Sequence, residues 1–139
     1  SNWPENLPKG TIHADFFPDN VFFNQNKISG VIDFYFSCYD LLSYDLAITL
    51  NAWCFKNGRF NKLKFKKLIS GYENKRKLEI EEKNKINILL RGASLRFLLT
   101  RIYDSMFSYK NKFLNPKDPL EYLNILEFHI NKKNESYFE

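Results

Sequence analysis

The feature that most restricts the fold is a change in hydrophobic periodicity near residue 40. Before it, residues 21–23 and 28–34 form two runs rich in β-branched and aromatic side chains, separated by the polar residues 24–27. This arrangement is typical of a β hairpin, and Gly30 inside the second run indicates a bulge or a close backbone approach. After residue 40, apolar residues recur at helical spacing. The pattern predicts an α+β fold that is mainly α, with a short β hairpin region followed by about four helices.

The first two predicted helices have recognisable ends. One begins at Asp40 and stops near Asn57-Gly58, a pair typical of a helix C-terminus. Asn61 is placed to cap the next helix, whose apolar positions continue to Tyr72.

The last two predicted helices differ in their surroundings. Residues 81–107 are apolar on nearly all sides, so this helix is expected at the centre of the fold. The final helix follows Pro119, and the polar tail from Lys132 is expected to fray. Its predicted buried stripe consists of Leu120, Leu123, Leu126 and Ile130.

Length and composition are those of one folded domain, residues 1–139. Hydrophobic residues make up 44% of the sequence and aromatic residues 17%, enough to bury a core and to exclude a disordered chain. The net charge of +5 is unevenly spread. Residues 56–85 are strongly basic, which we interpret as a solvated helix face and not as a nucleic-acid site. Residues 1–55 are acidic and would need a cation to offset them.

The sequence also predicts a cytoplasmic protein without a membrane span. The longest apolar stretch, residues 86–107, is interrupted by three arginines, which excludes a transmembrane helix. The start of the chain lacks the features of a signal peptide. Cys38 and Cys54 are expected to be free and buried, as in a reducing cytosol.

One motif suggests chemistry: Asp15 is followed five residues later by Asn20, and Asp33 ends the second β run. Because the hairpin returns to its starting point, the three side chains are expected to lie together. Kinase-type phosphoryl transfer uses such a set: one carboxylate receives the substrate hydroxyl proton, and an amide and a carboxylate bind Mg²⁺. We therefore assign Asp15 as the catalytic carboxylate and Asn20 and Asp33 as magnesium ligands.

Neighbouring residues are given supporting roles. His13 is expected to hydrogen-bond backbone in the Asp15 loop, and Asp45, at the start of a helix, to brace that loop through its N–H groups. Asp19 either binds substrate or metal or caps the turn. Trp53 lies on a helical stripe and is expected in the core.

In these motifs the sequence resembles the aminoglycoside-phosphotransferase-like kinases and, more narrowly, the homoserine kinases of that superfamily. The matching stretches are residues 13–23, 30–36, 44–55, 91–104 and 116–122, so the resemblance runs from about residue 9 to residue 129. It implies a protein-kinase-like fold, ATP and Mg²⁺ as cofactors, and transfer of the γ-phosphate to L-homoserine, a step toward threonine. It maps the catalytic Asp onto Asp15 and the magnesium ligands onto Asn20 and Asp33.

The chemistry of homoserine suggests further residues. An arginine could bind its carboxylate, and an acidic residue its ammonium group. Arg91, Arg96 and Arg101 do not share one helix face, so at most two can point toward the site. The predicted substrate-binding residues are Asp19, Tyr35, Asp40, Arg91 and Arg96.

The resemblance implies that the chain is a C-terminal lobe, without the Gly-rich loop and strand Lys of an N-terminal nucleotide-binding lobe. We therefore expect little activity from this polypeptide alone, and either a missing lobe or self-association as partners. Three alternatives stay open: a kinase lobe for another alcohol (choline, aminoglycoside or methylthioribose type), a non-catalytic interaction module, or nucleic-acid binding through residues 56–85.

Overall fold

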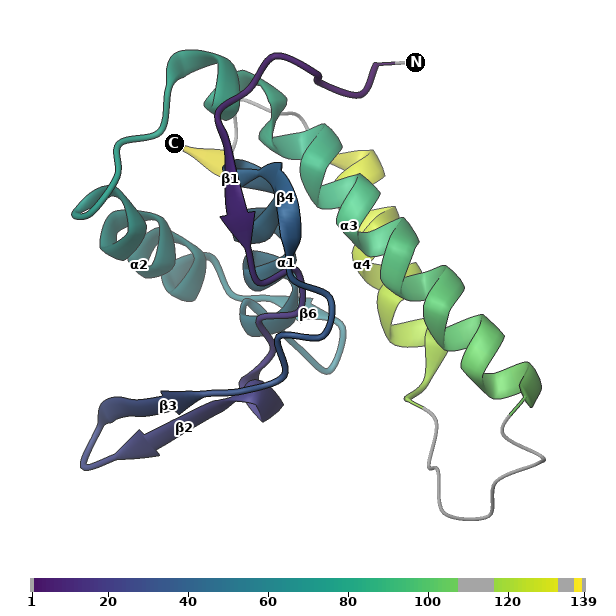
Figure 1. The fold of residues 1–139 in the computed structure, drawn as a ribbon. Helices are drawn as coiled ribbons and strands as arrows, with labels where there is room; N and C mark the ends of the chain where they lie inside the picture. Colours follow the sequence, from purple (N-terminus) through teal and green to yellow (C-terminus); the bar gives the residue numbers. More distant parts are fainter. Residues whose placement is uncertain (1, 108–116, 133–136, 139) are drawn as a thin grey trace.

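A computed structural model describes residues 2–107, 117–132 and 137–138 (Figure 1). The helices are α1 (Leu42–Trp53), α2 (Lys62–Glu73), α3 (Ile80–Phe107) and α4 (Pro119–Asn131). The strands are β1 (Lys9–Ile12), β2 (Val21–Asn24), β3 (Lys27–Val31), β4 (Cys38–Leu41), β5 (Phe55–Lys56) and β6 (Arg59–Phe60). They form three antiparallel pairs, β1–β4, β2–β3 and β5–β6. The predicted hairpin, β2–β3, and the predicted four helices are present, whereas the pairs β1–β4 and β5–β6 were not predicted.

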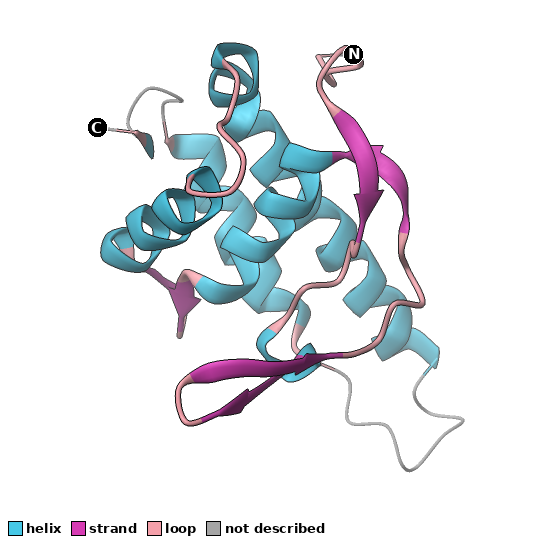
Figure 2. Ribbon diagram, turned by 60° about the vertical axis from the view of Figure 1, so that its left-hand side comes forward, coloured by secondary structure: helices cyan, strands magenta, loops and turns pink. Residues whose placement is uncertain are grey.

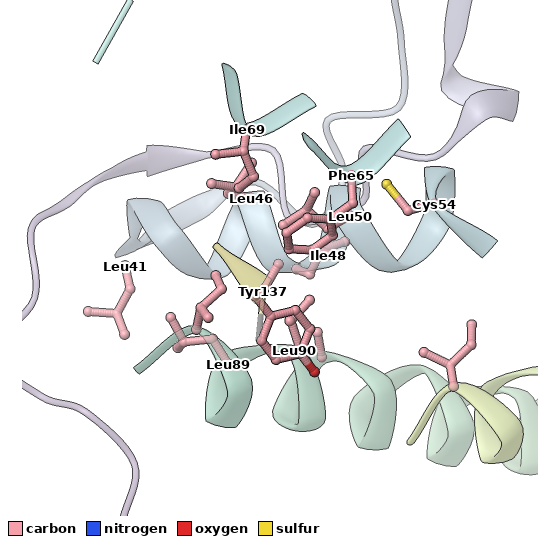
Figure 3. Close-up of a cluster of buried hydrophobic side chains, with 14 of the residues drawn as sticks. Leu41, Leu46, Ile48, Leu50, Cys54, Phe65, Ile69, Leu89, Leu90 and Tyr137 are labelled. Atoms are coloured by element: carbon pink, nitrogen blue, oxygen red, sulfur yellow. The ribbon is translucent and has the colours of Figure 1, made fainter. Parts of the chain in front are cut away.

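The helices form the body of the molecule, and α3 crosses it from end to end (Figures 1 and 2). Helix α3 packs against both α1 and α4, and α2 covers another side of α1. The core between α1, α2 and α3 includes Leu46, Leu50, Phe65, Ile69 and Leu90 (Figure 3). Each such side chain contributes about 1.5–3 kcal/mol on burial, so this cluster holds the helices together.

The β2–β3 hairpin projects from one end of the helical body (Figure 2). Its turn is tighter than predicted: Asn24 pairs with Lys27, so only Gln25 and Asn26 form the turn, and both have positive φ (48° and 63°). Such a turn suits the twist of two antiparallel strands. The register shifts next to Gly30, where the bulge was predicted. Strand β3 also ends at Val31, earlier than the predicted run of residues 28–34.

Strand β4 was not predicted, because residues 38–41 were assigned to the start of a helix or to the preceding loop. They pair with β1, Gly10 lying opposite Asp40, and α1 begins only at Leu42. A Cβ on Gly10 would come within 2.9 Å of the Leu42 side chain, so glycine allows the strand to approach the helix. The prediction that Cys38 is buried is wrong, since its place on β4 leaves it exposed.

Asn57-Gly58 was misassigned as a helix stop. Helix α1 ends at Trp53, and these two residues instead form the turn between β5 and β6, with φ of 50° and 72°. Both structures use residues that tolerate positive φ, so the pair alone does not distinguish them. The predicted cap of α2 is confirmed: the Asn61 side-chain oxygen accepts a hydrogen bond from the Lys64 N–H at 2.9 Å.

The burial of the last two helices also differs from prediction. The second half of α3 is not covered on all sides, and several of its apolar residues are exposed: Leu95, Leu99, Ile102, Tyr103, Met106 and Phe107. In α4 the buried face is Tyr122, Ile125 and His129, whereas Leu120 and Ile130 of the predicted stripe are exposed.

The C-terminal residues are partly tied to this core. Tyr137 is buried, and its hydroxyl lies 2.6 Å from His129 Nδ1, so the prediction of a fraying tail is wrong at this position. His129 Nε2 lies 2.8 Å from the Asn51 side-chain oxygen on α1. This buried polar chain connects α1, α4 and the C-terminal segment.

Two further predictions concern the whole chain. Cys54 is buried, and both cysteines are free, as expected. No helix within the described ranges has the length and apolar character needed to cross a membrane.

Candidate functional site

The Asp15 loop leaves β1 and is held by the first turn of α1. The Asp45 carboxylate accepts hydrogen bonds from the backbone N–H groups of His13, at 3.2 Å, and Ala14, at 2.7 Å. Ala14 has a φ of 60°, a left-handed conformation that L-residues rarely adopt. The two bonds to Asp45 therefore stabilise an unfavourable turn that presents Asp15 away from the strand.

His13 is fixed in one tautomer by two backbone partners. The Asp15 N–H can only donate, and it lies 3.2 Å from His13 Nδ1, which must therefore accept. The proton is then on Nε2, which donates to the Ile32 carbonyl at 2.9 Å. His13 thus joins the Asp15 loop to the segment that carries Asp33, with both ring nitrogens engaged.

Asp15 and Asn20 are in direct contact. The Asn20 side-chain N–H group donates to the Asp15 backbone oxygen at 2.9 Å and to its carboxylate at 3.2 Å. A short 3₁₀ helix, Pro18–Asn20, brings the chain back to make this contact. Because the amide nitrogen faces Asp15, the amide oxygen of Asn20 is the atom that can bind a cation.

Asp33 lies two residues beyond β3, in a left-handed conformation with φ of 62°, and is exposed. It is close enough to Asp15 for its charge to act on that carboxyl. Burial raises the pKa of Asp15 above its ordinary value; the Asn20 hydrogen bond lowers this pKa, and the negative charge of Asp33 raises it again. The structure thus brings the predicted Asp15, Asn20 and Asp33 together at the base of the β2–β3 hairpin.

The donor set suits Mg²⁺. In the part of the chain that the structure describes, no three His, Cys, Asp or Glu side chains gather around one point. The predicted ligands are instead one carboxylate, Asp33, and one amide oxygen, Asn20, which are hard oxygen donors of the kind that Mg²⁺ prefers alongside phosphate and water. A cation here would also offset the repulsion between Asp15 and Asp33.

An aromatic contact with α1 also holds the Asp15 loop. The Trp53 indole N–H donates to the Phe16 carbonyl at 2.8 Å, and the Trp53 ring stacks on Phe16 at 6.3 Å. Trp53 is half-buried, so it is both a part of the α1 packing surface and an anchor for the loop.

The three arginines of α3 point to different places. Arg96 donates to the Ala14 carbonyl at 2.8 Å and is near enough to Asp15 to lower its pKa. Arg91 is exposed; burial raises the pKa of Tyr137, near the C-terminus, and the charge of Arg91 lowers it. Arg101 pairs with Glu121 on α4 at 2.7 Å. Of the two arginines predicted to bind substrate, Arg96 contacts the Asp15 loop.

The other predicted substrate residues are spread around the loop. Asp19 pairs with Lys117 at 2.6 Å, and Tyr35 is 86% exposed, in edge contact with Phe36. The Asp40 carboxylate accepts a hydrogen bond from the N–H of Leu41 at 2.7 Å.

Two residues of the site were missed by sequence reasoning. Tyr44 is half-buried, and burial raises the pKa of its hydroxyl, while the nearby charge of Arg96 lowers this pKa and that of Asp40 raises it. Lys117 lies two residues before α4 and reaches back to Asp19, 98 positions away in sequence. Both residues lie in stretches that carry the family resemblance, 44–55 and 116–122, but their residue types alone indicated no role.

A groove of about 580 Å³ lies behind the loop, between β1, α1 and α2. Its lining is largely apolar and includes Phe16, Leu46 and Leu68, together with Asp45. Asp15, Asn20 and Asp33 are not among its lining residues, so the groove is separate from the polar site.

Comparison with known proteins assigns the chain to a family. A match to the phosphotransferase enzyme family covers residues 1–76, more than half of the chain, and includes every predicted residue from His13 to Asp45. The chain belongs to the phosphotransferase enzyme family. The resemblance predicted from the motifs is thereby confirmed.

Individual relatives narrow the comparison. The chain is 55% identical over 129 residues to a homoserine kinase of Sinorhizobium fredii, 55% identical over 130 residues to one of Xanthobacter autotrophicus, and 53% identical over 129 residues to one of Rhizobium meliloti. These matches cover 92–93% of this chain but 40% of each relative. The chain thus spans about two fifths of the length of the curated relatives that it matches.

Proposed function

We propose that this chain is the part of a homoserine kinase-type phosphotransferase that carries the catalytic carboxylate and the magnesium ligands, a kinase-like C-terminal lobe. The observation that carries the proposal is the contact between Asp15 and Asn20. Asp33 is close enough for its charge to act on Asp15, and Asp45 holds the loop that carries Asp15. The relatives, which are named homoserine kinases, support L-homoserine as the substrate.

In the proposed reaction the homoserine hydroxyl oxygen forms a bond to the γ-phosphorus of ATP, and the bond between that phosphorus and the bridging oxygen of ADP breaks. The hydroxyl proton passes to the Asp15 carboxylate, whose burial-raised pKa makes it a better acceptor than an ordinary aspartate. Asn20 keeps that carboxylate in place through its amide N–H. Asn20 and Asp33 would hold Mg²⁺, which would supply positive charge to offset that of the phosphates.

Asp40 is the predicted substrate residue that we retain for the ammonium group of homoserine. It lies in electrostatic reach of Tyr44, which is near Arg96 beside the Asp15 loop. One oxygen of its carboxylate accepts the Leu41 N–H, and the other oxygen is the candidate acceptor.

A chimera tests the function. Residues 9–129 of this chain would replace the matching segment of the Rhizobium meliloti homoserine kinase, and ATP-dependent phosphorylation of L-homoserine would be measured. We expect activity within tenfold of the parent enzyme, and a loss of about 10²–10⁴-fold in kcat for Asp15→Asn, the usual contribution of a positioned acid or base. Asp104→Asn, on the exposed surface of α3, is the matched control.

Several outcomes would contradict the proposal. A folded chimera without activity would oppose it, as would an Asp15→Asn variant that turns over normally. Faster phosphorylation of choline, an aminoglycoside or methylthioribose would replace homoserine with one of these alcohols. The 139-residue polypeptide by itself is expected to show little turnover, because Asp33 and the aromatic residues after it are exposed to water.

A further inference from the structure

The guanidinium group of the half-buried Arg96 contacts several groups of the protein. One N–H donates to the Ala14 carbonyl at 2.8 Å, and its charge is near enough to the Tyr44 hydroxyl to lower the pKa that burial raises. The centre of the guanidinium also lies 4.8 Å from the ring centroid of Phe97 and 5.4 Å from that of Phe36. Such stacking and hydrogen bonding use the planar shape of arginine, which lysine does not have.

Arg96 binds the residue of the loop that has an unfavourable, left-handed backbone conformation, Ala14. Ala14 has its left-handed φ of 60°, its N–H is bound by Asp45 of α1 at 2.7 Å, and its carbonyl is bound by Arg96 of α3. One hydrogen bond therefore lies on each side of the Ala14 Cα atom. Two helices that pack against each other thus fix the backbone angles of the residue before Asp15.

We propose that Arg96 is a positioning residue for Asp15, which holds the Ala14 carbonyl from α3 while Asp45 holds the Ala14 N–H from α1. An effect of Arg96 on catalysis rests on the proposed function, whereas its effect on the conformation of the loop does not. It differs from the expectation that Arg96 binds the substrate carboxylate. The guanidinium already donates to the Ala14 carbonyl and lies near the rings of Phe36 and Phe97, and these contacts hold it beside the loop.

Amide hydrogen exchange in the 139-residue chain tests the role without any need for activity. In Arg96→Gln we expect the Ala14 N–H to exchange at least about tenfold faster, while buried helical amides such as Leu50 and Leu90 keep their rates, the mark of a local opening. Arg96→Lys should recover part of the protection, because a lysine can donate to the Ala14 carbonyl but cannot stack as a plane. Arg91→Gln, the same change on an exposed position of α3, should leave Ala14 unchanged.

Tyr44→Phe is a milder variant that removes only the hydroxyl contact to Arg96, and we expect a smaller acceleration at Ala14. The backbone carbon chemical shifts of Ala14 provide a second readout, since they report whether its φ stays positive. Unchanged exchange and shifts at Ala14 in both Arg96→Gln and Tyr44→Phe would overturn the proposal. Equal acceleration of Ala14, Leu50 and Leu90 would also overturn it, because Arg96 would then support the fold in general.

Discussion

Replacement of Asp45 by asparagine should destabilise the protein measurably, although the two side chains have the same shape. The Asp45 carboxylate accepts from two backbone N–H groups, those of His13 and Ala14, and both residues are buried. Hydrogen bonds to a charged group contribute about 1.5–3 kcal/mol each, against about 1 kcal/mol for neutral ones. The asparagine oxygen can keep one neutral bond, while its NH₂ group would face the other N–H. We therefore expect Asp45→Asn to lower the free energy of unfolding by about 2–4 kcal/mol.

Urea denaturation followed by far-ultraviolet circular dichroism measures this change, with Asp104→Asn as the control on an exposed part of α3. A surface substitution of this kind should stay within about 0.5 kcal/mol of the parent. The double variant Asp45→Asn with Ala14→Gly should regain part of the loss, because glycine adopts positive φ without the steric cost that alanine has. A stability of Asp45→Asn equal to that of Asp104→Asn would refute the reasoning.

Three other substitutions test two buried polar groups and one close contact. Glu82 is fully buried and paired with Arg76, so Glu82→Gln should cost about 3–5 kcal/mol in urea unfolding; a loss below about 1 kcal/mol would contradict this. Burial lowers the pKa of His129 from 6.5 to about 3, so the folded state binds its proton less readily than the unfolded state. Stability should fall as the pH drops below about 6.5, by about 1.4 kcal/mol per unit until about pH 3, and His129→Gln should show a smaller slope between pH 6.5 and 5. A Cβ on Gly92 would lie 2.2 Å from the Trp3 ring, so Gly92→Ala should displace that indole and shift its fluorescence to the red; an unchanged spectrum would argue against the contact.

The sequence predicted the long helices because their apolar periods extend over many residues. Prediction from the sequence failed where the same residue pattern suits two different structures. Asn57-Gly58 suits a helix end and a tight hairpin equally, and β5 and β6 are only two residues long, too short for a period. In α4, leucines lie at the same three- and four-residue spacing as the residues that are buried. The choice between the two faces depends on Asn51 and Tyr137, which bind His129 from distant parts of the chain.

In the candidate site, too, contacts between residues close in sequence were predicted and contacts between distant residues were not. The short spacing from Asp15 to Asn20 predicted their proximity, and the hairpin between Asn20 and Asp33 predicted the third member. The sequence could not say which arginine of α3 reaches the loop, because Arg96 contacts a residue 82 positions away. That choice depends on how α3 packs against α1, a property of the folded core.

The hydrogen bonds that hold the Asp15 loop join helix side chains to backbone atoms, at the N–H groups of His13 and Ala14 and at the carbonyls of Ala14 and Phe16. Every amino acid except proline presents these groups. Exchange of the side chains at positions 16 and 19 is therefore compatible with the same backbone path, whereas exchange of the helix residues that bind the loop is not. In an engineered library, variation at positions 16 and 19 should be accepted more readily than variation at positions 45 and 96. New acceptor specificities are best sought by changing the loop and leaving its helical supports intact.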